Sequence, residues 1–209
     1  MPYSIAYSFV TLLVIIDPVS AAAVFATLTG NVPDEFSRRT AWRAIAIAGA
    51  LLLVFAFLGE WVLEALGITL PAFRIAGGIL LFLLATDMVF ARRSGIRTPT
   101  VPEQEEASRS TDVSVFPLAF PLLAGPGALT SIMLLMGRAR SPLEAAGVIG
   151  AMAAVLLLTL VVLLSAVRVM RFLGVTGANV VTRILGIVLA ALAAQLVLDG
   201  LTPFLGRPV

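Results

Sequence analysis

Long uncharged stretches alternate with short polar connections along all 209 residues of the chain. A membrane-spanning helix needs about 20 predominantly apolar residues. Two stretches reach this length with no charge at all: 25 residues separate Asp112 from Arg138, and 23 separate Glu144 from Arg168. Four other stretches carry few charges. The pattern predicts six transmembrane helices, over residues 4–30, 42–65, 71–91, 113–137, 143–167 and 180–204.

Composition places the chain among integral membrane proteins, because 60% of its residues are hydrophobic, 12% are charged and the mean hydropathy is +1.07. The expected fold class is all-α, and the lipid bilayer is the first expected partner. The chain has no Cys, His or Lys, so thiolate, imidazole and Schiff-base chemistry are excluded and neither a cofactor nor a metal site is expected. A net charge of +2 carried by Arg in short loops reads as a topology signal rather than as a nucleic-acid-binding surface.

The Arg residues are divided unequally between the two sides of a six-span chain. One side holds nine and the other three, which places the first, third and fifth connections in the cytoplasm and both termini outside. If the first and fourth segments are re-entrant hairpins instead, the division becomes ten against two, and that topology stays open. The first 37 residues contain no Arg, so a cleavable signal peptide is not expected.

The two halves of the chain resemble each other. Pro18 matches Pro126 at an offset of 108 residues, Arg74 matches Arg183 at 109, and Asp87 is followed by Asp199 at 112. The expected organisation is a three-helix repeat over residues 1–91, a cytoplasmic connecting loop over 92–112 and a second three-helix repeat over 113–209. Three spans per half is an odd number, so the second half enters from the opposite face, which is an inverted repeat of the kind found in secondary transporters.

The matched prolines predict breaks in the first and fourth helices near the mid-plane of the membrane. Asp17 is suited to an N-cap with Pro18 at the first helical position, and Gly125 with Pro126 gives a weaker form of the same signal. Two helix starts that approach one point from opposite faces form an anion site. The alternative is a pair of proline kinks in packed helices. The predicted solute-binding residues are Asp17, Pro18, Ser20, Gly125, Pro126, Gly127, Thr130 and Ser131.

Charged residues within the spans are expected to have a structural or functional role, because inserting a carboxylate at mid-membrane costs at least about 2.5 kcal/mol of free energy. Asp17 is expected either to cap the second half-helix or to bind a proton, a cation or the ammonium group of a solute. In the six-span topology Arg74 lies level with Asp199, and Asp87 with Arg183. We therefore predict two ion pairs, Arg74–Asp199 and Asp87–Arg183, which act either as alternating gates or as static ties between helices.

Four segments resemble those of the MarC family of bacterial inner-membrane proteins. The resemblance implies six spans, a bacterial or archaeal cytoplasmic membrane and distant kinship with LysE-type amino acid exporters, and some members are described as transporters of small neutral amino acids. In the family the Asp-Pro pair is usually followed by Gly and then Pro, whereas Ser20 and Ala23 stand at those positions here. The four segments are IIDPVSAAAVFATLTG (15–30), FRIAGGILLFLLATDM (73–88), PLAFPLLAGPGALTS (117–131) and RILGIVLAALAAQLVLDG (183–200).

The function expected from the sequence is secondary transport or export of a small zwitterionic solute, such as a neutral amino acid, rather than an enzymatic activity. A homo-oligomer is compatible with the sequence, which also leaves the direction and the coupling ion open. The second hypothesis is a membrane scaffold or assembly protein. The third is an intramembrane hydrolase with paired aspartates, which lacks both His and a GxGD string near Asp87 or Asp199.

Overall fold

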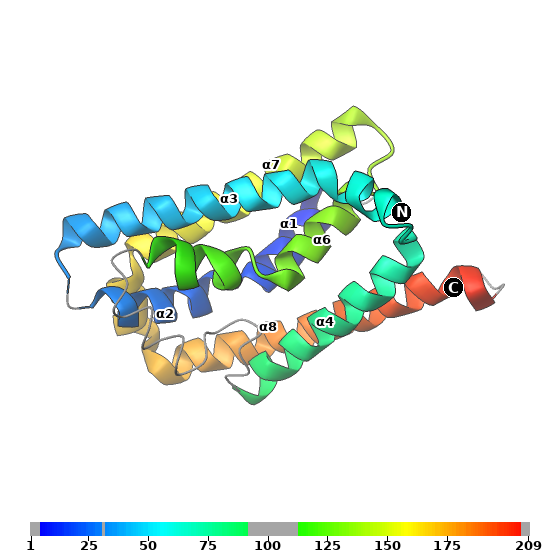
Figure 1. Cartoon of the computed structure of the whole chain (residues 1–209). Helices are drawn as coiled ribbons and strands as arrows, with labels where there is room; N and C mark the ends of the chain where they lie inside the picture. Colours follow the sequence, from blue (N-terminus) through cyan, green and yellow to red (C-terminus); the bar gives the residue numbers. More distant parts are fainter. Residues whose placement is uncertain (1–4, 31, 92–112, 206–209) are drawn as a thin grey trace.

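The computed structural model describes residues 5–30, 32–91 and 113–205, and all regular structure in these ranges is helical (Figure 1). The predicted loop over 92–112 lies outside the described residues. Compared with the predicted segments, the helix of the second span begins at Asp34 rather than at residue 42, and the last helix begins at Ala166 rather than at residue 180. The helices are α1 Ile5–Ile16, α2 Pro18–Thr29, α3 Asp34–Ala65, α4 Leu70–Phe90, η1 Ser114–Leu123, α6 Pro126–Met136, α7 Pro142–Leu164 and α8 Ala166–Leu205.

The described helices include 5 that are long and apolar enough to cross a membrane, and 6 when the bent pair η1 and α6 is taken as one span. The all-α membrane fold with five to six spans is thus confirmed. The first of these spans joins α1 and α2 into one stretch of 25 residues, Ile5–Thr29. In Figure 1, η1 and α6 follow each other along the bundle, and α1 begins toward the same end of it at which α8 finishes.

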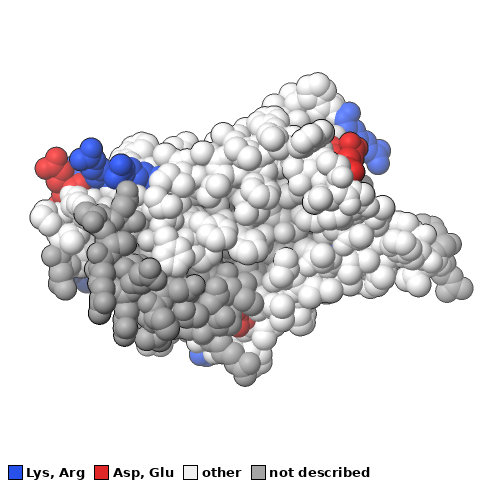
Figure 2. Space-filling model, viewed as in Figure 1, with Lys and Arg blue, Asp and Glu red and all other residues white. Residues whose placement is uncertain are grey.

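The outer surface has the polarity expected of a bilayer-spanning bundle. Figure 2 shows charged side chains at the left and right ends of the visible face and a further acidic and basic group at its lower edge, with a largely uncharged surface over the described residues between them. Trp42 and Trp61 on α3 are 54% and 66% exposed. They are 19 residues apart, about 28 Å along a helix, which matches the thickness of the hydrocarbon layer. Tryptophan favours the two membrane interfaces, so this pair marks the depth of the bundle in lipid.

Helices α4 and α8 form a long antiparallel pair with close backbone contact. A Cβ atom on Gly78 of α4 would lie 2.8 Å from the carbonyl oxygen of Ala193 in α8. One on Gly200 of α8 would lie 2.9 Å from the carbonyl oxygen of Pro71 in α4. Membrane helices gain little from the hydrophobic effect between themselves, so small residues that permit such an approach give the pair its packing.

Two helices are irregular for identifiable reasons. In η1 the backbone is extended at Phe116 and Phe120, and each residue precedes a proline, whose ring excludes the helical conformation from the residue before it. In α8 the helix is interrupted at Gly174, which has φ 64° and ψ 177°. The part of α8 that spans the bundle begins just after this interruption, at Thr176.

Replacing Gly78 by alanine should lower the free energy of unfolding by about 1–3 kcal/mol, because the added methyl meets the backbone of α8. The measurement is the apparent melting temperature of the detergent-purified chain. Gly150→Ala in α7 is the matched control, since a Cβ there meets no atom within 4 Å. Equal melting temperatures for the two variants would contradict this account of the α4–α8 contact.

Candidate functional site

The first break lies at Asp17, between α1 and α2. Asp17 adopts φ 45° and ψ 78°, a left-handed conformation that aspartate tolerates better than most residues. Its N–H donates to the carbonyl of Leu13, and its own carbonyl accepts from the N–H of Ala21, so backbone hydrogen bonds continue on both sides of the break. Asp17 stands at the N-cap of α2 and Pro18 at its first position, where the sequence places them.

The Asp17 carboxylate is fully buried and hydrogen-bonded. One oxygen, Oδ1, accepts from the backbone N–H of Ser20 at 3.2 Å, and the other, Oδ2, accepts from the hydroxyl of Thr182 at 3.2 Å. The first contact caps α2, and the second connects α2 to α8. Ser20 therefore contributes its backbone rather than its hydroxyl to this arrangement. Thr182 is a hydrogen-bond partner of Asp17 that the sequence did not reveal, because it lies 165 residues away and carries no local motif.

The second break lies between η1 and α6, which are bent by 55°. Pro126 is the first residue of α6, and Gly125 stands at the N-cap position with no side-chain hydrogen bond to the helix. A Cβ atom at Gly125 would collide with the carbonyl oxygen of Pro121, so glycine is required here. The N-terminus of α2 is thus capped by a carboxylate, whereas that of α6 has no capping side chain.

The two breaks come together around Ile15, two residues before Asp17. The Ile15 side chain lies 3.7 Å from where a Cβ on Gly127 would stand. Between them is a cavity of about 20 Å³, which we call the break cavity. Such a volume holds about one water molecule. The break cavity is lined by Ile15, Leu80, Leu84, Pro121, Leu122, Gly125, Pro126, Gly127 and Ala128.

A second cavity of about 20 Å³, the hydroxyl cavity, also borders Ile15. Thr11 and Ser131 are among its lining residues, and neither hydroxyl has a hydrogen-bond partner in the described part of the chain, although the surface of the cavity itself is almost wholly apolar. Thr130 points elsewhere and places its methyl group against Gly77 of α4. Of the predicted residues in α6, Ser131 lines the hydroxyl cavity, whereas Pro126 and Gly127 line the break cavity. The hydroxyl cavity is lined by Tyr7, Thr11, Ile15, Leu81, Ser131, Leu134, Leu135, Arg138, Leu189, Leu192 and Leu196.

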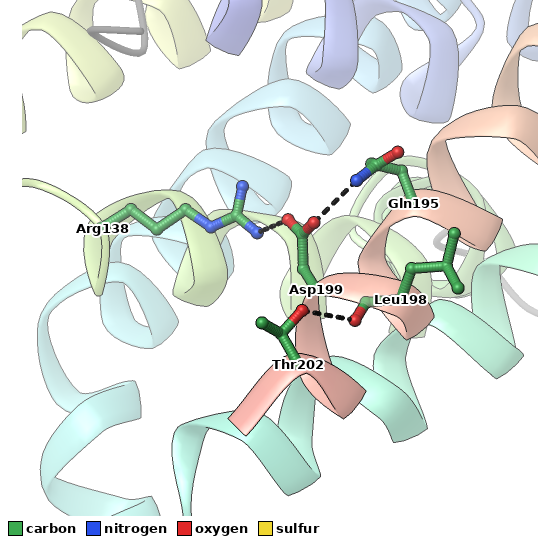
Figure 3. Close-up of polar contacts among 5 residues, drawn as sticks. All are labelled: Arg138, Gln195, Leu198, Asp199 and Thr202. Carbon is green, nitrogen blue, oxygen red and sulfur yellow. Dashed lines mark hydrogen bonds and ion pairs between the residues drawn. The ribbon is translucent and has the colours of Figure 1, made fainter. Parts of the chain in front are cut away.

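The prediction that Asp199 pairs with Arg74 is wrong. Asp199 Oδ2 is 2.7 Å from Nη2 of Arg138, and Asp199 Oδ1 accepts from the amide of Gln195 at 2.7 Å (Figure 3). Arg74 does lie beside Asp199 in depth, since its Cβ is 3.2 Å from the Cβ position of Gly200. Arg138 makes the ion pair because it follows the end of α6 and extends toward α8.

The predicted pair of Asp87 with Arg183 is not formed either. Gly186 of α8 faces Met88 and Val89 of α4. Arg183 precedes Gly186 by three residues, almost one helical turn. Because α4 and α8 are antiparallel, this turn places Arg183 past the C-terminal end of α4, on the side of Met88 and Val89 that faces away from Asp87. Arg183 is exposed on α8, and no ion pair joins it to Asp87 in ranges 5–30, 32–91 and 113–205. Within the same ranges no group of three His, Cys, Asp or Glu side chains is arranged to hold a metal ion.

A bundle of apolar helices with a buried carboxylate, an uncapped helix start and charges at both ends defines a multi-pass integral membrane protein. Residues 3–205 match the model of the MarC family of integral membrane proteins. The chain belongs to this family, as its sequence motifs predict.

Relatives occur in archaea and bacteria. The chain is 38% identical over 194 residues to the UPF0056 membrane protein MJ1677 of Methanocaldococcus jannaschii, covering 93% of this chain and 94% of the relative. It is 38% identical over 197 residues to a UPF0056 membrane protein of Aquifex aeolicus, with 93% and 90% covered. It is 34% identical over 196 residues to the UPF0056 inner membrane protein YhgN of Escherichia coli, with 92% and 93% covered. No solved structure matches the fold.

Removing the Thr182 hydroxyl should destabilise the bundle. Thr182→Val takes a donor from a fully buried carboxylate, which costs about 1–3 kcal/mol of unfolding free energy. The control is Thr202→Val on the same helix, whose hydroxyl donates to the carbonyl of Leu198 and touches no charge. A melting temperature for Thr182→Val that equals that of Thr202→Val would show that the contact with Asp17 contributes nothing.

Proposed function

We propose that the protein is a secondary transporter of a small zwitterionic solute such as a neutral amino acid. The observation that carries this proposal is the Asp17 carboxylate, which is fully buried, midway along a 25-residue span and at a chain break. Such a carboxylate is costly in lipid, and ionisable residues within membrane spans mark solute, ion or proton pathways. Ile15, two residues away, borders both the break cavity and the hydroxyl cavity.

The helix contacts support an inverted repeat in which α1 and α2 correspond to η1 and α6, α3 to α7, and α4 to α8. The broken span α1–α2 packs against α7, and the broken span η1–α6 packs against α3. Likewise α2 packs on α8 and α6 on α4. If each helix is replaced by its counterpart in the other half, every one of these helix contacts becomes another contact of the same list. Two halves related by a two-fold axis have this property. Transporters of this plan bind solute at broken helices near the repeat interface.

The solute is oriented by two different groups at the breaks. Asp17 already occupies the N-terminus of α2, so a solute carboxylate does not bind there, and Asp17 instead faces the solute ammonium. The carboxylate faces α6, whose N-terminus has a positive dipole end and no capping side chain. The break cavity and the hydroxyl cavity each hold about one water, so entry of a solute at the breaks requires the surrounding helices to separate.

The two aspartates of the hydrolase hypothesis lie far apart in the bundle. Asp87 is next to Met88, which faces Gly186 of α8. Asp199 lies 13 residues further along α8 than Gly186, so Asp87 and Asp199 are about 20 Å apart. Paired catalytic aspartates must share a proton at direct contact. These two residues therefore do not form a dyad in the closed bundle.

Purified chain in proteoliposomes should take up radiolabelled neutral amino acids, and Asp17→Asn should reduce the initial rate by tenfold or more. If Asp17 also carries the coupled proton, the variant loses the dependence of uptake on a pH gradient. Asp34→Asn, at an exposed carboxylate in the first turn of α3, is the matched control and should transport normally.

Pro126→Ala tests the second break in the same assay and should slow uptake, because a continuous helix hides the free N–H groups of α6. Wild-type protein that moves no member of the amino acid panel, together with a stoichiometric partner in pull-downs, would replace transport by the scaffold hypothesis.

A further inference from the structure

A short helical segment, residues 166–173, joins α7 to the spanning part of α8. It lies between two interruptions, since α7 ends at Leu164 and the backbone of Gly174 adopts φ 64° and ψ 177°. The last two apolar spans cover Pro142–Leu164 and Thr176–Leu205, so the segment lies outside both. In Figure 1 the chain makes this connection at the end of the bundle where α3 begins. The 166–173 segment is therefore placed at the membrane surface rather than within the membrane.

The 166–173 segment has one packed face and one exposed face. A helix turns by about 100° per residue, so its four exposed side chains fall within one arc of about 140°. The two Arg residues lie in the middle of this arc, and Val167 and Phe172, which are 62% and 91% exposed, lie at its edges. The exposed side chains are Val167, Arg168, Arg171 and Phe172, and the buried or half-buried ones opposite them are Ala166, Val169, Met170 and Leu173.

The charges of Arg168 and Arg171 have no counterpart in the surrounding sequence. No Asp or Glu occurs from residue 145 to residue 198. Neither guanidinium forms an ion pair in the part of the chain that the structure describes. Basic side chains beside a bilayer are attracted to negatively charged headgroups, and aromatic side chains favour the membrane interface. Two uncompensated cations next to an almost fully exposed Phe172 are therefore the groups that a surface helix presents to lipid.

The start of α3 lies at the same end of the bundle and carries Arg38 and Arg39 in a different setting. Asp34 and Glu35 each precede one of them by four residues, about one helical turn. The four side chains together carry no net charge. The 166–173 segment thus differs from the start of α3 in that its positive charge is not balanced by acidic residues.

We propose that the exposed face of the 166–173 segment binds the headgroups of anionic phospholipids in the leaflet at this end of the bundle. Val167 and Phe172 enter the boundary between headgroups and acyl chains, where the apolar side chains of surface helices lie. Arg168 and Arg171 stand at the level of the lipid phosphates, and each adds to the attraction for a negative headgroup. A zwitterionic headgroup carries its own cation beside the phosphate and is bound less tightly. This lipid-binding surface does not depend on the function proposed above.

The test compares two phospholipids on the detergent-purified full chain, with bound lipid measured by native mass spectrometry. Phosphatidylglycerol should bind more tightly than phosphatidylcholine by on the order of tenfold, as expected for two Arg side chains at the headgroups. Arg168→Gln with Arg171→Gln should remove this preference, whereas Arg168→Lys with Arg171→Lys should keep most of it, because the charge is retained. Arg38→Gln with Arg39→Gln is the matched control at the same end of the bundle and should leave the preference unchanged.

The depth of Phe172 in the membrane is a second measurement. The chain has no Cys, so Phe172→Cys gives a single site for a spin label. In nanodiscs that contain phosphatidylglycerol, the label should collide more often with oxygen, which concentrates in lipid, than with a water-soluble nickel complex. Glu35→Cys is the control, since Glu35 is exposed in the first turn of α3 and a label there should meet the nickel complex more often.

A preference for phosphatidylglycerol that survives the Arg168 and Arg171 glutamine substitutions overturns the proposal. An equal loss in the Arg38 and Arg39 variant overturns it as well, because the attraction would then belong to the whole end of the bundle. Inorganic phosphate should not displace the lipid, and displacement would assign the two Arg residues to a soluble anion instead. A label at Phe172 that meets mainly the nickel complex would show that the segment does not lie on lipid.

Discussion

The hydrogen bonds of the Asp17 carboxylate are the interaction on which the rest of the bundle depends. Within lipid no water satisfies a polar group, so a broken span persists only where the protein supplies the missing partners. Asp17 does this from inside the break, since one oxygen accepts from the start of α2 and the other from Thr182 on α8. The break, the burial of a charge and the attachment of the first span to the last helix are therefore one arrangement, held by a single carboxylate.

The α4–α8 pair provides the rigid counterpart to the broken spans. At Gly78 and Gly200 the backbones of α4 and α8 are so close that a Cβ atom would not fit between them. Two helices packed this closely cannot slide far along each other. The broken spans pack instead through leucine, isoleucine and methionine side chains around two small cavities. In the transporter proposed above, movement between inward-open and outward-open states is accordingly expected at α1–α2 and η1–α6, where side chains can repack, and not between α4 and α8.

The sequence predicted those features that are encoded locally. Asp17 with Pro18 and Gly125 with Pro126 are helix-start signals that depend on adjacent residues, and the structure begins α2 and α6 at these prolines. The topology alone predicted that Arg74 and Asp199 lie at the same depth in the membrane, as they do. It did not predict which residue pairs with Asp199, because Arg138 extends to Asp199 from the end of another helix. Thr182 was missed for the same reason: a lone threonine in an apolar helix carries no signal until its neighbours in space are known.

The difference between the two breaks gives the pathway a direction. A perfect inverted repeat would present equivalent groups to both faces of the membrane. In this chain the first break carries its own carboxylate, and the second has glycine and no capping side chain. In the transporter proposed above, the N-terminus of α6 faces the carboxylate of the solute and Asp17 faces its ammonium. On that proposal, the difference between the two breaks, rather than the shape of either cavity, selects a solute that bears both charges.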